Sequence, residues 1–169
     1  MTKAWMLAAA VLVLGGSWTP AEACSCVVGG PMPPGLTEAE RRERTLENTR
    51  RQVRGLLDSA YAIFSGEAIA KNLNTVTFKL DKSWKGGLPA EFQVASGPFT
   101  HPDGSVSISS CDFTFTVGQK YLVFAKASTI AAVEGMPCTP TGELKYAADV
   151  VAMLNELAPK LLKPGSPAY

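Results

Sequence analysis

Two cysteines separated by one serine, Cys24 and Cys26, follow directly on the tripeptide Ala21-Glu22-Ala23. An Ala-x-Ala triplet near the N-terminus is typical of the site that signal peptidases cut. A cut after Ala23 makes Cys24 the first residue of the mature chain. That residue then carries a free α-amine, and a disulfide would clamp it in place. This arrangement is the strongest indication of function in the sequence.

The residues before the cut have the pattern of a signal peptide. Lys3 gives a short positive start, and residues 4–14 form an apolar run of 11 residues. A transmembrane helix needs ~20 apolar residues, so this run is too short to be one. We expect residues 1–23 to be cleaved and the mature chain to be secreted, periplasmic or extracellular. Two alternatives stay open: a buried N-terminal helix, and a lipid anchor at Cys24, although Ala21 stands where a lipoprotein site has a large aliphatic residue.

The mature chain has the size of one domain and a nearly neutral charge. It keeps 146 of the 169 residues, with 15 basic and 14 acidic side chains. A chain of this length buries about 68% of its unfolded surface. Nucleic-acid binding needs clustered positive charge, so we expect no nucleic acid as a partner. We expect one domain over residues 24–162, a disordered tail over 163–169, and a monomer.

All four cysteines lie in the mature chain, at Cys24, Cys26, Cys111 and Cys138. An even number in an exported protein favours disulfides. A Cys24–Cys26 bridge would close a very small, strained ring, and both other connectivities tie the N-terminus to the second half of the chain. Each bridge then closes a loop of roughly 85–115 residues, worth up to ~5 kcal/mol in chain entropy. The alternative is that the four thiolates bind zinc, but the paired Cys-x2-Cys motifs of such sites are missing.

Two helices should flank a set of strands. Thr37 and Glu40 form a capping box, so we expect an inserted helix over about 37–57 with a narrow apolar stripe. Its six arginines and four glutamates favour a solvated face with many ion pairs, and an anion-binding role is the alternative. Apolar residues at 3.6-residue spacing predict a C-terminal helix over about 145–158, which Pro159 should end.

Between the helices the chain alternates apolar and polar residues, as strands do. This pattern marks residues 62–70, 75–84, 92–94, 106–108 and 121–125. Gly66 suggests a bulge or a tight bend in the first segment, and the last segment, the most continuous apolar run, should be the buried centre. About five short strands with two helices and long loops predict a mainly β fold, a small closed barrel.

The sequence lacks the usual constellations for catalysis. His101 is the only histidine, and its neighbours Pro102 and Asp103 suit a solvated loop. One histidine cannot form a multi-His metal site, and no cysteine is left over as a nucleophile. The motifs of a nucleophile elbow, a phosphate-binding loop and a His-Glu-x-x-His zinc site are also missing. We therefore expect no enzyme activity and no cofactor.

Several segments resemble one known family in their order and spacing. They are Cys24-Ser25-Cys26, residues 63–66, residues 76–86, and residues 110–125 followed by Cys138. The most specific pieces are the Cys-x-Cys start and the Gly-x-x-Tyr-Leu-Val strand that begins at Gly118. On these residues the chain resembles the netrin-like (NTR) modules, and within them the tissue inhibitors of metalloproteinases (TIMPs), especially their short bacterial relatives.

The resemblance implies a five-stranded OB-fold-like closed barrel with the disulfides Cys24–Cys111 and Cys26–Cys138. In the animal inhibitors, the amine and carbonyl of the N-terminal cysteine chelate the catalytic zinc of the protease. Carried over, Cys24 is the chelator, its only metal being the zinc of a bound protease, and Ser25 enters the specificity pocket. The inhibitory wedge then consists of Cys24, Ser25, Cys26, Ser109 and Ser110.

The chemistry of such a wedge is sound. A catalytic zinc keeps an open position and can hold a fifth ligand, so an amine and a carbonyl can displace its water. An α-amine has a pKa of ~7.7–8.0, so losing its proton at neutral pH costs only about 1 kcal/mol. A disulfide beside the amine lowers the ordering cost of binding.

The chain also departs from the animal inhibitors. It lacks their third disulfide and their C-terminal domain, Asp112 follows Cys111 where the family commonly has glycine, and the helix over 37–57 could shade the wedge. We expect a secreted inhibitor whose partner is a zinc metalloprotease. The alternative is a non-inhibitory extracytoplasmic NTR-type module that binds a partner through the barrel face or the arginine-rich helix. An unrecognised enzyme is the third interpretation.

Overall fold

The structure, a computed structural model, describes residue 26 and residues 32–129, 131 and 133–161. Helix α1 (Glu38–Ser59) leads into two long strands, β1 (Ala62–Lys71) and β2 (Thr75–Lys85). The remaining elements are β3 (Glu91–Ala95), β4 (Phe99–Thr100), β5 (Val106–Ser107), β6 (Lys120–Ala127), β7 (Val133–Gly135), β8 (Gly142–Glu143), the 3-10 turn η1 (Leu144–Tyr146) and α2 (Ala148–Leu161).

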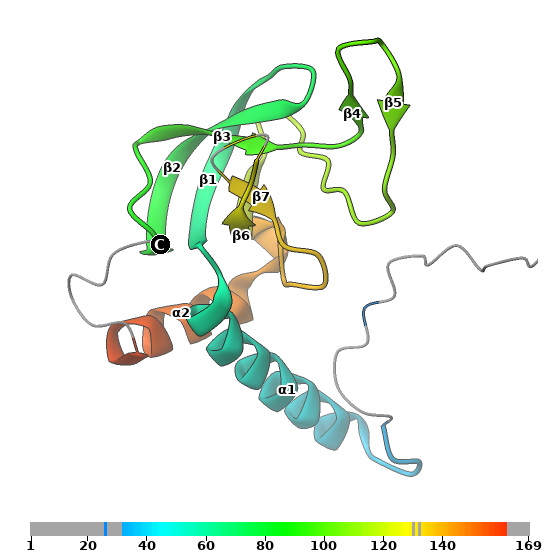
Figure 1. Cartoon of the computed structure of the whole chain (residues 1–169). Coiled ribbons are helices and arrows are strands. Elements are labelled where there is room, and N and C mark those ends of the chain that lie inside the picture. Colours follow the sequence, from blue (N-terminus) through cyan, green and yellow to red (C-terminus); the bar gives the residue numbers. More distant parts are fainter. Residues whose placement is uncertain (1–25, 27–31, 130, 132, 162–169) are drawn as a thin grey trace, which may run out of the picture.

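Five of the strands close into a barrel. The order around it is β1-β2-β3-β7-β6, and β6 pairs with β1 to complete the circle. Neighbours are antiparallel except β3 and β7, which run parallel. Closure removes the long unpaired edges that an open sheet would expose. The predicted fold, an OB-like five-stranded barrel with one inserted and one C-terminal helix, is confirmed (Figure 1).

Strand β6 is buried on both of its faces. Tyr121, Val123 and Ala125 belong to the core inside the barrel, whereas Leu122 and Phe124 belong to a second core between the barrel and the helices. Side chains alternate between the two faces of a strand, so a continuous apolar run is required only where both faces are covered. The helices supply the outer cover, and the predicted buried centre over residues 121–125 is confirmed.

Aromatic side chains fill the barrel interior. Phe64 lies edge-on to Phe92 with ring centroids 4.6 Å apart, and Phe78 lies edge-on to Phe115 at 5.1 Å. Phe115 also meets Tyr121 at 5.0 Å. Edge-to-face pairs at these separations are favourable beyond the area they bury. Because four of these rings come from β1, β2, β3 and β6, their contacts tie opposite walls of the barrel together.

Helix α1 begins at the predicted capping box. The Thr37 hydroxyl and N–H donate to Glu40 Oε2 at 2.7 and 2.8 Å, and these bonds hold the pKa of the Glu40 carboxyl below its usual value. The buried residues of the helix, Val53, Leu56 and Leu57, all lie near its C-terminal end. The N-terminal half therefore projects away from the barrel (Figure 1).

Helix α2 differs from the prediction at both ends. It begins at Ala148 rather than near 145, because Leu144–Tyr146 form a 3-10 turn before it. The prediction that Pro159 ends the helix is wrong, since the helix continues through this residue to Leu161. In the last turn a proline removes one hydrogen bond, to the carbonyl four residues earlier. Burial of Leu157 against the second core holds this part of the helix in place.

The fifth barrel strand is not the one that the sequence pattern predicted. Val106 and Ile108 are 54% and 80% exposed, and β5 pairs with β4 in a two-stranded ribbon separate from the barrel. The place in the barrel belongs to β7, where Val133 pairs with Val94 of β3. A strand of three residues is too short to show an alternating pattern, so no periodicity marks it in the sequence.

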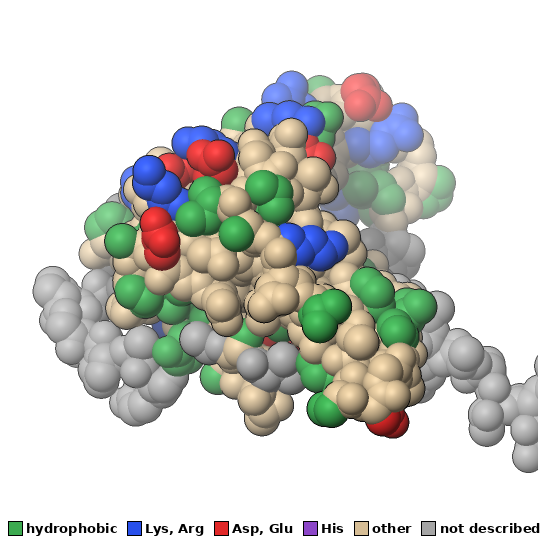
Figure 2. Space-filling view, turned by 90° about the horizontal axis from the view of Figure 1, so that it is seen from above, with side chains coloured by type: hydrophobic (Ala, Val, Ile, Leu, Met, Phe, Trp, Pro, Cys, Tyr) green, Lys and Arg blue, Asp and Glu red, His purple; other side chains and the backbone are tan. Residues whose placement is uncertain are grey.

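The face of the molecule opposite α1 carries charges of both signs. In Figure 2, which views the molecule from above, Lys and Arg side chains are interspersed with Asp and Glu, and hydrophobic side chains are scattered among polar ones. Elsewhere on the barrel, Lys120 Nζ of β6 lies 2.8 Å from Asp81 Oδ2 of β2, and this hydrogen bond raises the pKa of Lys120. Such exposed pairs are screened by solvent and add little stability.

Gly66 provides a test of the close strand packing. Strands β1 and β2 shift register at this residue, and a Cβ on it would lie 2.6 Å from the Lys79 carbonyl oxygen. We expect Gly66→Ala to lower the free energy of unfolding by about 1–3 kcal/mol, because the backbone must move aside. The matched control is Gly55→Ala in α1, where a Cβ meets nothing within 4 Å.

The control should raise the free energy of unfolding by about 0.5–1 kcal/mol, because alanine favours the helix more than glycine does. Urea unfolding measures both variants against the parent protein. Midpoints that move in the same direction, or a Gly66→Ala midpoint equal to that of the parent, would contradict the prediction.

Candidate functional site

An exposed disulfide joins Cys26 to Cys138 in the loop between β7 and β8. The sulfur atoms are 2.03 Å apart, and the two residues are 112 positions apart in sequence. The structure thus contains one of the two disulfides that the resemblance implies. Cys111 is also disulfide-bonded. Because Cys24 and Ser25 lie outside the described residues, the Cys24–Cys111 pair and the roles of Cys24 and Ser25 stay predictions.

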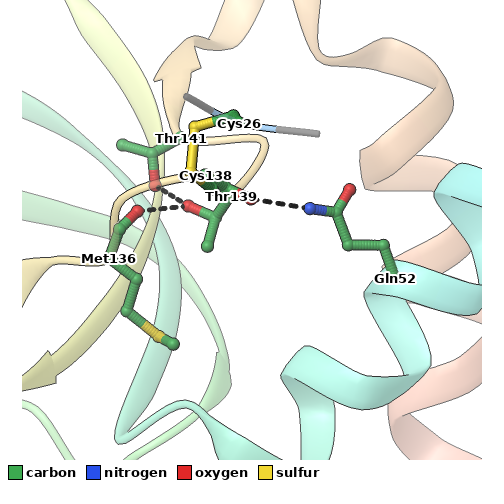
Figure 3. Close-up of a disulfide and its surroundings, with 6 residues drawn as sticks. All are labelled: Cys26, Gln52, Met136, Cys138, Thr139 and Thr141. Atoms are coloured by element: carbon green, nitrogen blue, oxygen red, sulfur yellow. Dashed lines mark hydrogen bonds between the residues drawn. A yellow bond between two sulfur atoms is a disulfide. The ribbon is translucent and has the colours of Figure 1, made fainter. Parts of the chain in front are cut away.

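Threonine side chains fix the Cys138 loop to the barrel. Thr139 Oγ1 donates to the Met136 carbonyl oxygen at 2.7 Å and lies 2.9 Å from Thr141 Oγ1. The Thr141 hydroxyl accepts the N–H of Phe124 at 3.0 Å, and Phe124 is a fully buried residue of β6. The disulfide therefore lies on a loop that is bonded directly to the most buried strand (Figure 3).

Helix α1 supports the same loop from the other side. Gln52 Nε2 donates to the carbonyl oxygen of Cys138 at 2.7 Å (Figure 3). Cys138 has a φ of 58°, a left-handed conformation that a residue with a side chain rarely adopts. Pro137 precedes Cys138 and Pro140 follows two residues later, and their rings restrict the loop further. Hydrogen bonds on both sides thus hold Cys138 in an unusual but defined conformation.

The second part of the candidate site is the turn that leads to Cys111. Ser109 N–H donates to Asp112 Oδ2 at 2.8 Å, and Cys111 N–H donates to Ser109 Oγ at 3.1 Å. Phe113 lies against Gly135 of β7 so closely that a Cβ on this glycine would come within 2.4 Å of its ring. Asp112 therefore closes the turn, and Phe113 fixes the turn to the barrel.

An open cavity of about 410 Å³ lies between these segments. Its lining comes from Cys26, Gln52, residues 110–113 and residues 137–140. The structure thus brings Cys26 and Ser110 of the predicted wedge together, whereas Ser109 is outside the lining. Among the described residues of α1, Gln52 alone reaches the cavity, so the helix borders the site on one side.

Sequence reasoning missed three residues of this site: Gln52, Phe113 in its packing role, and Thr139. A glutamine on a polar helix face has no distinguishing pattern, because its partner lies 86 positions away. The prolines on either side of Cys138 were the one sequence feature that pointed to this part of the site, since paired prolines mark a restricted loop. They indicated that the loop is constrained, but not which residues hold it.

The cavity lining offers binding contacts. Its walls combine aromatic, proline and disulfide groups with the polar side chains of Gln52, Ser110 and Thr139, and among the described lining residues only Asp112 is acidic or basic. Within the described residues, no three His, Cys, Asp or Glu side chains gather as they would around a metal ion. His101 lies instead in the connection between β4 and β5, with its Nε2 2.6 Å from Ser107 Oγ and its ring against Phe99. The arrangement suits contact with another molecule through shape and backbone groups.

Two arginines of α1 form ion pairs with glutamates. Arg50 pairs with Glu156 of α2, and Arg51 lies 3.4 Å from Glu47, one turn earlier in the same helix. The pair with Glu156 raises the pKa of Arg50. These contacts agree with the interpretation of a solvated, ion-paired helix face.

No protein-family model matches the chain, and no curated protein shows significant sequence similarity to it. The functional interpretation therefore depends on the geometry of the site and on the resemblance in the sequence. Among the helices that the structure describes, none combines the length and the apolar character needed to cross a membrane.

Removing the Cys26–Cys138 bridge tests its contribution to stability. We expect the double variant Cys26→Ser, Cys138→Ser to lose about 2–5 kcal/mol of unfolding free energy, because its unfolded chain is no longer cross-linked. Urea unfolding without reductant measures the loss. The far-UV circular dichroism of the folded variant should match that of the parent, since the barrel strands pair without the bridge. A loss below the stated range would contradict the prediction.

Proposed function

We propose that the chain is an exported metalloprotease inhibitor that binds the catalytic zinc of its target through Cys24 at the mature N-terminus. The observation that carries the proposal is the position of Cys26, which is bonded to an exposed loop at the cavity, beside Ser110 and Cys111. In this proposal, residues 1–23 are a cleaved signal peptide, Cys24 pairs with Cys111, and the zinc belongs to the protease.

The rigidity of the surroundings supports this role. A wedge that must be ordered on binding loses affinity, whereas a pre-organised wedge does not. The loop that carries Cys138 is bonded to β6 through Thr141 and to α1 through Gln52. The turn before Cys111 is closed by Asp112. Both segments that line the cavity with Cys26 are therefore fixed before any partner arrives.

The proposed reaction at the zinc is an exchange of ligands. A catalytic zinc holds a water in its open position, and this water is the nucleophile of the protease. The neutral amine of Cys24 and its carbonyl oxygen take the place of that water, so hydrolysis stops. Ser25 is small enough to enter specificity pockets of different shapes, which favours a broad choice of proteases.

A non-inhibitory binding module is the second candidate, and the cavity favours it. Phe113, Pro137 and Pro140 give the cavity apolar walls, which are common in sites that bind ligands or peptides. A partner can occupy such a cavity without a metal ion and without a free N-terminus. This function would therefore tolerate a blocked or lipidated Cys24, whereas zinc chelation would not.

Two forms of the refolded protein separate the candidates. One form begins at Cys24, and the other carries a single extra alanine before it. We expect only the first to inhibit members of a panel of zinc metalloproteases, because the extra residue converts the amine into an amide. The inhibition constant should rise by more than about 100-fold, equivalent to roughly 3 kcal/mol of lost zinc coordination.

Disulfide mapping and circular dichroism must agree between the two forms, so that any difference reports on the amine. Inhibition by neither form would refute the proposed mechanism and favour the binding module. Equal inhibition by both forms would show a contact that does not use the zinc.

The same mechanism predicts how inhibition depends on pH. Only the neutral amine binds zinc, and an α-amine titrates at ~7.7–8.0. At pH values below this range, each increase of one pH unit should therefore raise the affinity about tenfold, and above the range the affinity should level off. Inhibition constants measured from about pH 6 to pH 9 test this pH dependence. A small-molecule zinc chelator serves as the reference for the titration of the protease itself. A flat profile relative to the reference would contradict amine coordination.

A further inference from the structure

We infer that Gln52 of α1 is a positioning residue for the Cys26–Cys138 disulfide, and so for the surface that would meet a protease. The effect on protease binding rests on the proposed function. The effect on the disulfide concerns the described residues alone and can be measured separately. The inserted helix is then part of the functional surface, although it lies outside the segments that resemble the inhibitor family.

The geometry of one hydrogen bond carries the inference. Gln52 Nε2 lies 2.7 Å from the carbonyl oxygen of Cys138, which fixes the direction of the peptide group that follows Cys138. The left-handed φ of 58° at Cys138 is costly for a residue with a Cβ and persists only where surrounding groups enforce it. The direction of the Cys138 side chain, and with it the attachment of Cys26, depends on this enforced conformation.

The helix is a rigid support at this position. Val53, the next residue, is fully buried in the core between the helices and the barrel. Arg50, two residues earlier, pairs with Glu156 of α2. Gln52 itself is only half-buried, so it is not needed to fill the core. Its position is set by its neighbours, and its amide is available to hold the loop.

The opposite side of the loop has its own support on β6 through Thr139 and Thr141. Loss of the Gln52 bond should therefore leave the loop attached but free to rotate about Cys138. An intramolecular hydrogen bond of this kind shifts a local equilibrium by about 2- to 10-fold. We expect an effect of that size on the disulfide, with little change in global stability.

The decisive variant is Gln52→Glu. At neutral pH its carboxylate has the shape of the amide but can only accept hydrogen bonds, so it cannot donate to the Cys138 carbonyl. Below a pKa of about 4.3 the carboxyl is protonated and regains a donor. The matched control is Gln93→Glu, the same change at an exposed position of β3 outside the lining of the cavity.

The measurement is the rate at which a phosphine reductant, which acts in acid and at neutral pH, opens each disulfide of the refolded protein. Alkylation and mass spectrometry report the two bridges separately. We expect Gln52→Glu to open Cys26–Cys138 about 2- to 10-fold faster than the parent at neutral pH, and at the parental rate at about pH 3. The bridge of Cys111, and both bridges of the control, should react as in the parent.

Equal rates in Gln52→Glu and the parent at neutral pH would overturn the inference. Faster opening of both bridges would also overturn it, because a general loosening of the fold would then be the cause. In parallel, Gln52→Glu should weaken protease inhibition by about 2- to 10-fold at neutral pH, while the control inhibits like the parent. If the parent inhibits no protease, the proposed function fails and the reduction rates alone decide the role of Gln52.

Discussion

The double burial of β1 and β6 is the constraint on which the rest of the structure depends. Phe64 and Val123 fill the barrel, while Ile63, Leu122 and Phe124 point outward into the second core. Fully burying one such side chain is worth about 1.5–3 kcal/mol. An uncovered barrel would expose the outward set to water. Helices α1 and α2 are therefore required by the strand sequences, and α1 is not a dispensable insertion.

This requirement also explains how the candidate site is held. The packing that covers β6 places α1 beside the loop between β7 and β8, where Gln52 reaches Cys138. Strand β6 holds the opposite side of the loop, because the Phe124 N–H donates to Thr141 Oγ1. The core thus determines the surface, because a disulfide in an irregular loop obtains its orientation from two elements that are themselves fixed by apolar packing.

The sequence was informative where a pattern is local and repeated. The capping box at Thr37, the bulge at Gly66 and the continuous apolar run of β6 each follow from rules that act over a few residues. The strand β7 was missed because its place depends on parallel pairing with β3, 39 positions earlier at Val94↔Val133. Residues 106–108 alternate correctly, yet among the described residues Val106 and Ile108 stay exposed. An alternating pattern predicts an extended segment, but whether that segment joins the sheet is decided by tertiary pairing.

The same distinction applies to the site. The resemblance to a family motif pointed to Cys26, Ser110, Cys111 and Cys138, which line the cavity, whereas Gln52 and Phe113 act through contacts with residues far away in sequence. These long-range supports hold the loop to which Cys26 is bonded in a defined conformation. Both candidate functions need that conformation, since a pre-organised edge lowers the ordering cost of binding any partner. Zinc coordination by Cys24 would add affinity and specificity for metalloproteases to a platform that the barrel, α1 and the Cys26–Cys138 bridge already provide.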